Sequence, residues 1–138
     1  MEGRVLGQAR GVDEAPVEAL VEEATRRSAV IWVRGEDGRE QALWHLWHAG
    51  AAYVVTGGLE QPWPGGDGAV LVTVRSRERQ AGRVVQWGAA VEQVAPGSAR
   101  WDEVVPLLAA QRLNAPDGPR QAERWARACR VLRLVPAS

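Results

Sequence analysis

The sequence predicts a mainly β protein, in which an antiparallel sheet closes into a small barrel flanked by helices. The region from residue 28 to 94 carries β-branched segments separated by Gly-rich turns, which is typical of consecutive hairpins. A helical pattern precedes this region, and two helical patterns and a last strand follow it. This order favours an antiparallel barrel over a sheet of βαβ units. At 138 residues we expect a single domain, residues 1–138, with a flexible N-terminus at 1–15.

Each predicted element has its own local signal. Pro16 opens a helix over 17–27, whose apolar residues recur at helical spacing and which ends in two arginines. Residues 49–50, Ala-Gly, join two apolar runs into a hairpin. Ser98 can cap the helix that follows it, and a second, shorter helical stretch is predicted at 120–130. The six strands are expected at 28–34, 42–48, 51–57, 69–79, 82–94 and 131–136.

The stretch ALWHLWHAGAAYVV carries two histidines three residues apart. Neighbouring side chains of a strand alternate between its faces, so His45 and His48 point to opposite sides. No carboxylate or cysteine in the stretch completes a set of metal ligands, and we expect no metal site there. The alternation places Trp44 and Leu46 on one face, and His45 and Trp47 on the other. One histidine near a ligand, as a hydrogen-bond donor, is the alternative.

The composition excludes several classes of function. The chain has 17 basic and 17 acidic residues, so no net charge favours nucleic acid or an anionic membrane. All the basic residues are arginines, so no lysine can form a Schiff base. Cys129 is the only cysteine, which rules out a disulfide within the chain. No apolar stretch has the character of a signal peptide or a membrane span, and we expect a cytoplasmic protein.

An arginine-rich stretch, RSRER, ends one of the predicted strands. Arg75, Arg77 and Arg79 are spaced by two, so all three face the same side if the strand continues, while Ser76 faces the other side. A line of guanidinium groups can bind a phosphate in bidentate fashion. The alternative is a solvated strand end, partly neutralised by Glu78.

A long loop at 57–68, GGLEQPWPGGDG, has five glycines and two prolines, which excludes a regular element. It is not a nucleotide-binding P-loop, because it lacks the Gly-Lys-Ser/Thr sequence. Gly-rich backbone after a strand can approach a ligand closely, and the loop is long for a hairpin link. A mobile connection without a role in binding is the alternative.

The order of these segments resembles the pyridoxamine 5'-phosphate oxidase-like family of FMN-binding split barrels. The resemblance covers about 28–135 and lies in SAVIWVR, ALWHLWHAGAAYVVTGG, AVLVTVRSRER and GRVVQWGAAVEQV. It implies a six-stranded antiparallel split barrel of Greek-key type, which forms a homodimer with two FMN sites between the subunits. It also implies that basic and hydroxyl side chains on the barrel strands hold the FMN phosphate.

The resemblance also implies which residues of this chain bind the cofactor. The candidates are Arg75, Ser76 and Arg77 at the phosphate, Thr56 nearby, and Gln86 and Trp87 along the ring system. Arg112 and Trp125, in the C-terminal helices, would reach the site from the other subunit. The resemblance assigns no catalytic acid or base.

The chain departs from the family pattern after the Thr-Gly strand end. Many members have a Ser-Arg-Lys-type segment there that helps to hold phosphate, whereas this chain has LEQPWP, without a basic residue. Two functions are therefore considered. The first is a flavin-binding protein that uses FMN, with oxidoreductase activity on a small molecule. The second is a non-catalytic dimeric barrel that binds a deazaflavin, haem or another planar ligand, or none; for haem, His45 or His48 could be the axial ligand.

Overall fold

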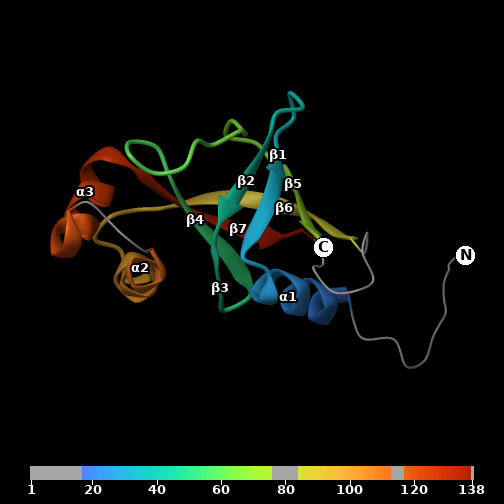
Figure 1. The fold of residues 1–138 in the computed structure, drawn as a ribbon, viewed down its shortest axis with the longest axis horizontal. Coiled ribbons are helices and arrows are strands. Elements are labelled where there is room, and N and C mark those ends of the chain that lie inside the picture. The colour runs from blue at the N-terminus through green and yellow to red at the C-terminus, as the bar shows by residue number, and fades with distance from the viewer. Residues whose placement is uncertain (1–16, 76–83, 113–116, 138) are drawn as a thin grey trace, which may run out of the picture.

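The computed structural model describes residues 17–75, 84–112 and 117–137, so the segment 1–15 that was predicted to be flexible lies outside the described residues. The described part contains three α-helices, one 3-10 turn and seven strands (Figure 1). The helical elements are α1 (Val17–Arg27), α2 (Ala99–Gln111), η1 (Gly118–Arg120) and α3 (Gln121–Ala128). The strands are β1 (Val30–Arg34), β2 (Glu40–Trp44), β3 (Leu46–His48), β4 (Ala51–Thr56), β5 (Val70–Arg75), β6 (Val84–Val94) and β7 (Arg130–Pro136).

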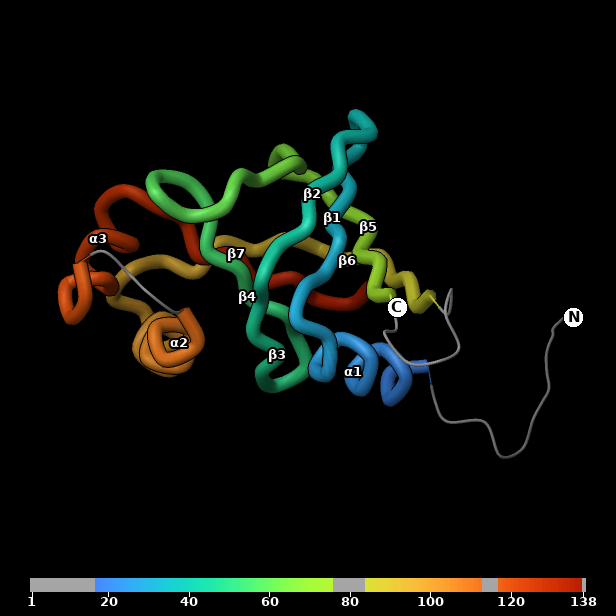
Figure 2. Tube along the Cα trace, in the orientation of Figure 1, coloured from blue at the N-terminus to red at the C-terminus, as the bar shows by residue number. Residues whose placement is uncertain are grey.

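The seven strands form one antiparallel sheet in the order β2-β1-β5-β6-β7-β4-β3. Strands β2 and β3 lie at its two edges, yet only His45 separates them in the chain. The sheet must therefore curl until its edges meet, and Figure 2 shows the strands wrapped into a half-barrel. The predicted split barrel is confirmed. It has seven strands rather than six, because the strand predicted at 42–48 is divided at His45.

Side chains from other elements hold the backbone where this strand divides. The side-chain amide of Gln61 accepts a hydrogen bond from the Trp44 N–H at 2.6 Å and donates one to the Trp44 carbonyl at 3.1 Å. The His45 carbonyl accepts a hydrogen bond from Gln111 of α2. The His45 ring donates through Nε2 to the Thr25 carbonyl of α1, at 2.7 Å. Because these contacts replace the ladder bonds that are lost at the corner, the chain can pass from one edge of the sheet to the other.

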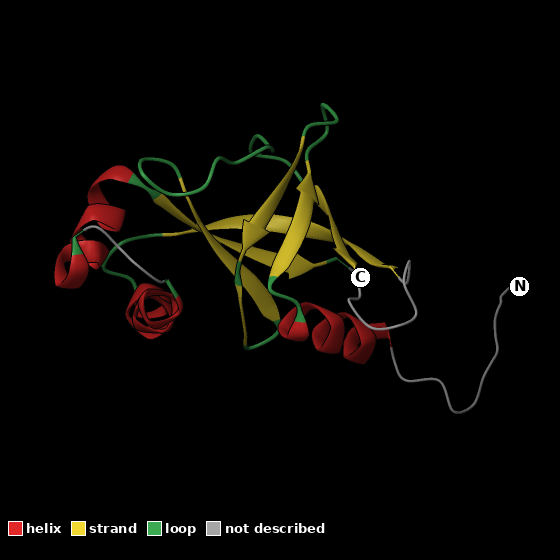
Figure 3. Cartoon of the chain, viewed as in Figure 1, coloured by secondary structure: helices red, strands yellow, loops and turns green. Residues whose placement is uncertain are grey.

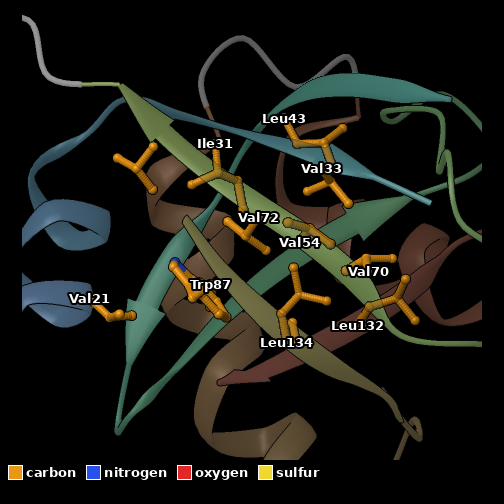
Figure 4. Packing of buried hydrophobic residues seen from close by; sticks show 13 residues of the cluster. Val21, Ile31, Val33, Leu43, Val54, Val70, Val72, Trp87, Leu132 and Leu134 are labelled. Carbon is orange, nitrogen blue, oxygen red and sulfur yellow. The ribbon is translucent and has the colours of Figure 1, made fainter. Parts of the chain in front are cut away.

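Alternating side chains of the sheet build two separate cores. The inner core fills the barrel (Figure 4), and ten of its members are Val21, Ile31, Val33, Leu43, Val54, Val70, Val72, Trp87, Leu132 and Leu134. The outer core lies on the opposite face of the sheet and includes Trp101, Leu108 and Trp125 from α2 and α3. Figure 3 shows these two helices together at one end of the sheet and α1 apart from them.

The predicted alternation around the two histidines is confirmed. Trp47 packs against the inner core, whereas Trp44 and Leu46 pack against the outer core. His45 points toward α1, and His48 contacts Glu103 of α2 instead. The division at His45 therefore changes the strand pairing but keeps the faces that the sequence predicted.

The loop 57–68 packs over the β1–β2 turn. A Cβ atom on Gly35 would lie 2.8 Å from the Pro64 carbonyl oxygen and 2.9 Å from the Gly65 Cα, so the two backbones touch where only glycine fits. Trp63 packs against the inner core, and its indole Nε1 donates to the Gly66 carbonyl at 3.0 Å. The loop therefore closes this end of the barrel.

Candidate functional site

The outer face of β1, β5 and β6 carries a row of three polar and aromatic side chains. Trp32 lies opposite Thr73, and Thr73 lies opposite Gln86, so the three are neighbours across the strands. The Gln86 Nε2 donates a hydrogen bond to the Thr73 Oγ1 at 3.1 Å. Since alternate residues of a strand share a face, this row lies on the side of the sheet away from the inner core.

An arginine and two small residues extend the row. Arg75 is exposed at the end of β5, with its Cζ 5.2 Å from the centroid of the Trp32 ring, a cation–π contact. On β6, Gly88 and Ala90 continue the face of Gln86, and a Cβ added at Gly88 would meet nothing within 4 Å. We call Trp32, Thr73, Arg75, Gln86 and Gly88 the outer-face patch. A planar ligand could lie on the ring and the bare backbone while the guanidinium binds an anionic group.

Trp87 does not share this face with Gln86, although the sequence interpretation placed both along a ring system. Its side chain belongs to the inner core, with the residue 6% exposed. The indole Nε1 donates to the Thr25 Oγ1 at 3.1 Å, and the ring meets Trp47 edge to face at 6.1 Å between centroids. This placement follows from the strand itself, because adjacent residues point to opposite faces.

The structure separates Thr56 from the predicted phosphate-binding residues. Of those three, it places only Arg75, since Ser76 and Arg77 lie outside the described residues. Arg75 pairs with the first residue of β6, whereas the Thr56 end of β4 lies, through β7, beside the last residue of β6. An 11-residue strand spans roughly 35 Å. Within one chain, Thr56 and Arg75 therefore do not form one site.

A second polar site surrounds Glu60 of the loop, where α2 and α3 cover the sheet. The Glu60 side chain is 1% exposed and accepts hydrogen bonds from Arg112 Nε at 3.0 Å, Arg124 Nη2 at 3.0 Å and Trp125 Nε1 at 3.1 Å. Arg124 also donates through Nε to Asp117 at 2.6 Å. We call these five residues the Glu60 cluster. The resemblance placed Arg112 and Trp125 at a cofactor of the other subunit, but here both bind Glu60 of their own chain.

Burial and hydrogen bonding oppose each other at Glu60. Burial acts to raise its pKa, but the hydrogen bonds from Trp125, Arg112 and Arg124 together outweigh burial and hold the pKa below its ordinary value. The hydrogen bond from Arg124 likewise lowers the pKa of Asp117, and Asp117 in turn raises the pKa of Arg124. The Glu60 and Asp117 carboxyl groups are therefore ionised at neutral pH.

Both histidines make protein contacts. His45 is 3% exposed, and burial lowers its pKa even though the hydrogen bond to the Thr25 carbonyl acts in the other direction. The His48 Nε2 lies 2.5 Å from a carboxylate oxygen of Glu103. Within residues 17–75, 84–112 and 117–137, no group of three metal-ligating side chains comes together.

Sequence reasoning missed Trp32 and Thr73 of the outer-face patch and the role of Glu60. Trp32 alternates with buried neighbours along β1, and Thr73 alternates in face with Val72 and Val74, although Thr73 is itself only 4% exposed. The pattern does not reveal that β1 pairs with β5, and it is this pairing that places Trp32 beside Thr73. The Glu60 contacts join positions 52 to 65 residues apart, and no local motif marks them.

Comparison with known proteins identifies the fold. The sequence matches no model of a protein family and no curated protein. A putative pyridoxamine 5'-phosphate oxidase from Listeria innocua superposes with a TM-score of 0.59 and 10% identity, over 89% of this chain and 95% of that one. The haem storage protein HutZ from Vibrio cholerae superposes with a TM-score of 0.57 and 13% identity, over 90% of this chain and 92% of that one. An F420 reductase superposes with a TM-score of 0.57 and 17% identity, over 85% of this chain and 93% of that one.

The chain thus has the split-barrel fold of the pyridoxamine 5'-phosphate oxidase-like proteins, as the order of its segments predicted. At these identities the similarity establishes the fold alone. The names of the similar structures point to different ligands, so the ligand of this chain has to be argued from its own residues. Among the described residues, no helix combines the length and apolar character that crossing a bilayer requires.

Proposed function

We propose that this protein is a cytoplasmic homodimer that binds FMN on the outer-face patch. The observation that carries the proposal is the presence of a guanidinium, an aromatic ring, an amide and an open glycine on one face of β1, β5 and β6. Arg75 lies over Trp32, and Gln86 holds a neighbouring position across the sheet. A phosphate, a planar ring system and its hydrogen-bonding edge need these kinds of group.

Each group has a separate proposed role. Arg75 binds the phosphate, with Ser76 and Arg77 of the same stretch assisting it. Trp32 packs against the planar ring system, and the Gln86 amide forms hydrogen bonds with its edge. A bound flavin supplies hydride or electron transfer, while the protein binds its phosphate, orients its ring system and excludes water. On this basis we propose oxidoreductase activity on a small molecule.

Apolar side chains beside the patch support the pairing of two chains. Val30 is 39% exposed and Val84 is 45% exposed. Val84 lies directly opposite Arg75, and Val30 lies two residues before Trp32, on the same face. Burying such side chains is favourable, and a second copy placed on this face would also shield a ligand from water.

Two alternative ligands are suggested by the proteins that share the fold. A deazaflavin has a similar planar ring system and a phosphate, so it would use the same outer-face patch. Haem would need a ring nitrogen of a histidine as axial ligand. His45 is buried with Nε2 on the Thr25 carbonyl, and the His48 Nε2 is bonded to Glu103. These contacts favour FMN over haem.

A fluorescence titration tests the proposal. FMN should quench the tryptophan emission saturably, because Trp32 lies in the patch. Arg75→Ala should weaken binding about 10- to 100-fold, since a hydrogen bond to a charged group contributes about 1.5–3 kcal/mol. Arg39→Ala is the matched control: its side chain is 79% exposed in the β1–β2 turn, and its removal should leave the affinity unchanged.

Riboflavin separates the phosphate contact from the ring contact. It lacks the phosphate, so it should bind the wild-type protein more weakly than FMN does, and Arg75→Ala should not weaken it further. Absence of saturable quenching by FMN would exclude the flavin site. An equal loss of affinity in Arg75→Ala and Arg39→Ala would exclude Arg75 as the phosphate ligand.

A further inference from the structure

Three hydrogen-bond donors converge on one buried carboxylate in the Glu60 cluster. Arg112 Nε lies 3.0 Å from one oxygen of Glu60 and 3.3 Å from the other. Arg124 Nη2 and Trp125 Nε1 both bind the second oxygen, at 3.0 and 3.1 Å. A planar carboxylate held by two guanidiniums and an indole is the arrangement of a binding site for a carboxylate ligand.

The donors are held in place by contacts other than those to Glu60. Arg124 is 8% exposed and is fixed by Asp117, which accepts from its Nε at 2.6 Å and from its Nη2 at 3.2 Å. The Trp125 ring is fully buried in the outer core. In addition, Arg124 Nη1 is buried and has no hydrogen-bond partner among the described residues. The site therefore has one donor group, Arg124 Nη1, that Glu60 does not use, and Asp117 and the outer core would still hold Arg124 and Trp125 if Glu60 left.

The carboxylate itself is carried by a different kind of element. Glu60 stands on the loop 57–68, after two glycines at positive φ, 87° for Gly57 and 56° for Gly58. Leu59, between these glycines and Glu60, is 67% exposed. The donors lie at the end of α2 and on α3, 52 to 65 positions away in the chain. The loop thus carries the anion, whereas the donors that bind it belong to other elements.

We propose that Arg112, Arg124 and Trp125 form a binding site for a small carboxylate, which the protein fills with its own Glu60. A free carboxylate competes with Glu60 in the wild-type chain and binds once the loop withdraws it. A tethered group acts at an effective concentration in the millimolar range or above. The half-saturating concentration of an external carboxylate should therefore be at least about tenfold higher for the wild-type chain than for a variant without the Glu60 side chain. This site is independent of the proposed flavin site.

The test is chemical rescue of Glu60→Ala by formate. The midpoint of thermal unfolding is measured against formate concentration, with sodium chloride replaced so that ionic strength is constant. We expect the midpoint of Glu60→Ala to rise saturably, by about 3–5 °C at ten times the half-saturating concentration. The wild-type midpoint should rise less than that of Glu60→Ala at every formate concentration, because Glu60 competes with formate for the same donors. Adding Arg112→Gln to Glu60→Ala should abolish the response.

The remaining outcomes are also decisive. If Glu60→Ala does not fold in chloride, recovery of folded protein in formate supports the site, and Glu60→Ser serves for the titration. Failure of both variants to fold in formate, or a flat response in folded Glu60→Ala, overturns the proposal. Phosphate at the same ionic strength should act like chloride; rescue by phosphate equal to that by formate would refute the assignment to carboxylates.

Discussion

Replacing Glu60 by glutamine removes one charge from the Glu60 cluster while keeping the size of the side chain. The carboxylate accepts hydrogen bonds from Arg112, Arg124 and Trp125, using both of its oxygens. In Glu60→Gln only one oxygen is left to accept them, and the new NH₂ group faces N–H donors. We expect this variant to be substantially less stable than the wild type at neutral pH.

The magnitude follows from the exposure of the partners. Removing one member of a buried ion pair costs about 3–5 kcal/mol, because the remaining charge stays buried without compensation. The Arg112 side chain is 19% exposed and can be partly hydrated, and Arg124 keeps Asp117. We therefore expect the lower end of that range, about 3 kcal/mol at pH 7. Urea unfolding measures this loss, with an unchanged m-value.

The pH dependence supplies an independent check. The folded-state pKa of Glu60 is held below its ordinary value of 4.5. A carboxyl of this kind contributes stability that is fully present above the unfolded pKa and is lost as pH falls through the folded pKa. The difference in unfolding free energy between wild type and Glu60→Gln should thus shrink on acidification below about pH 4.5. Other carboxyl groups titrate in both proteins, so to first order their effects cancel in the difference.

Two results would refute this reasoning. The first is a free energy of unfolding for Glu60→Gln within about 1 kcal/mol of the wild-type value at pH 7, because a loss that small is typical of an exposed ion pair. The other is a difference that stays constant down to the acid unfolding of the wild type. Glu92→Gln is the control, because Glu92 binds Arg133 with its side chain 55% exposed. It should cost little at any pH.

Two further predictions concern single side chains in the barrel. Gln61→Ala should lower the unfolding free energy by about 1–3 kcal/mol in a urea titration, because it removes the hydrogen bonds to the Trp44 backbone. The control is Gln93→Ala, which should have little effect because Gln93 is exposed. Trp87→Phe should lower the unfolding free energy by about 1–3 kcal/mol, because it leaves the buried Thr25 hydroxyl without its indole donor. The same variant should leave FMN affinity unchanged, since Trp87 faces the inner core. Weaker FMN binding by Trp87→Phe would return this residue to the cofactor site.

Much of the fold was predictable because the pattern of side chains reports local geometry. Period-two alternation gave the strands and the correct faces of Trp44, Leu46 and Trp47. The helix cap at Ser98 was also predicted, and the Ser98 Oγ accepts from the Trp101 N–H at 3.1 Å. The division at His45 was not predicted, because Gln61 and Gln111 make it tolerable from distant positions.

The candidate site was less predictable than the fold, for a related reason. A sequence motif gives neighbours along the chain, whereas this site depends on neighbours across strands. Arg75 and Gln86 both lie on the outer face of the sheet, whereas Trp87, which the family resemblance grouped with Gln86, belongs to the inner core. The resemblance also grouped Thr56 with Arg75, although the length of β6 separates them within one chain.

The sequence did not decide whether the loop 57–68 binds a ligand or only connects two strands. In the structure, this loop links three parts of the molecule. Glu60 binds the end of α2 and α3, and the next residue, Gln61, binds the backbone at the end of β2. In this arrangement Glu60 binds the guanidinium groups of Arg112 and Arg124 at this end of the sheet. The absence of a basic residue from LEQPWP therefore has a structural counterpart, which is that the loop supplies the anion itself. Arg75 of β5, on which the FMN proposal depends, lies at the opposite end of β6, where it pairs with the first residue of that strand.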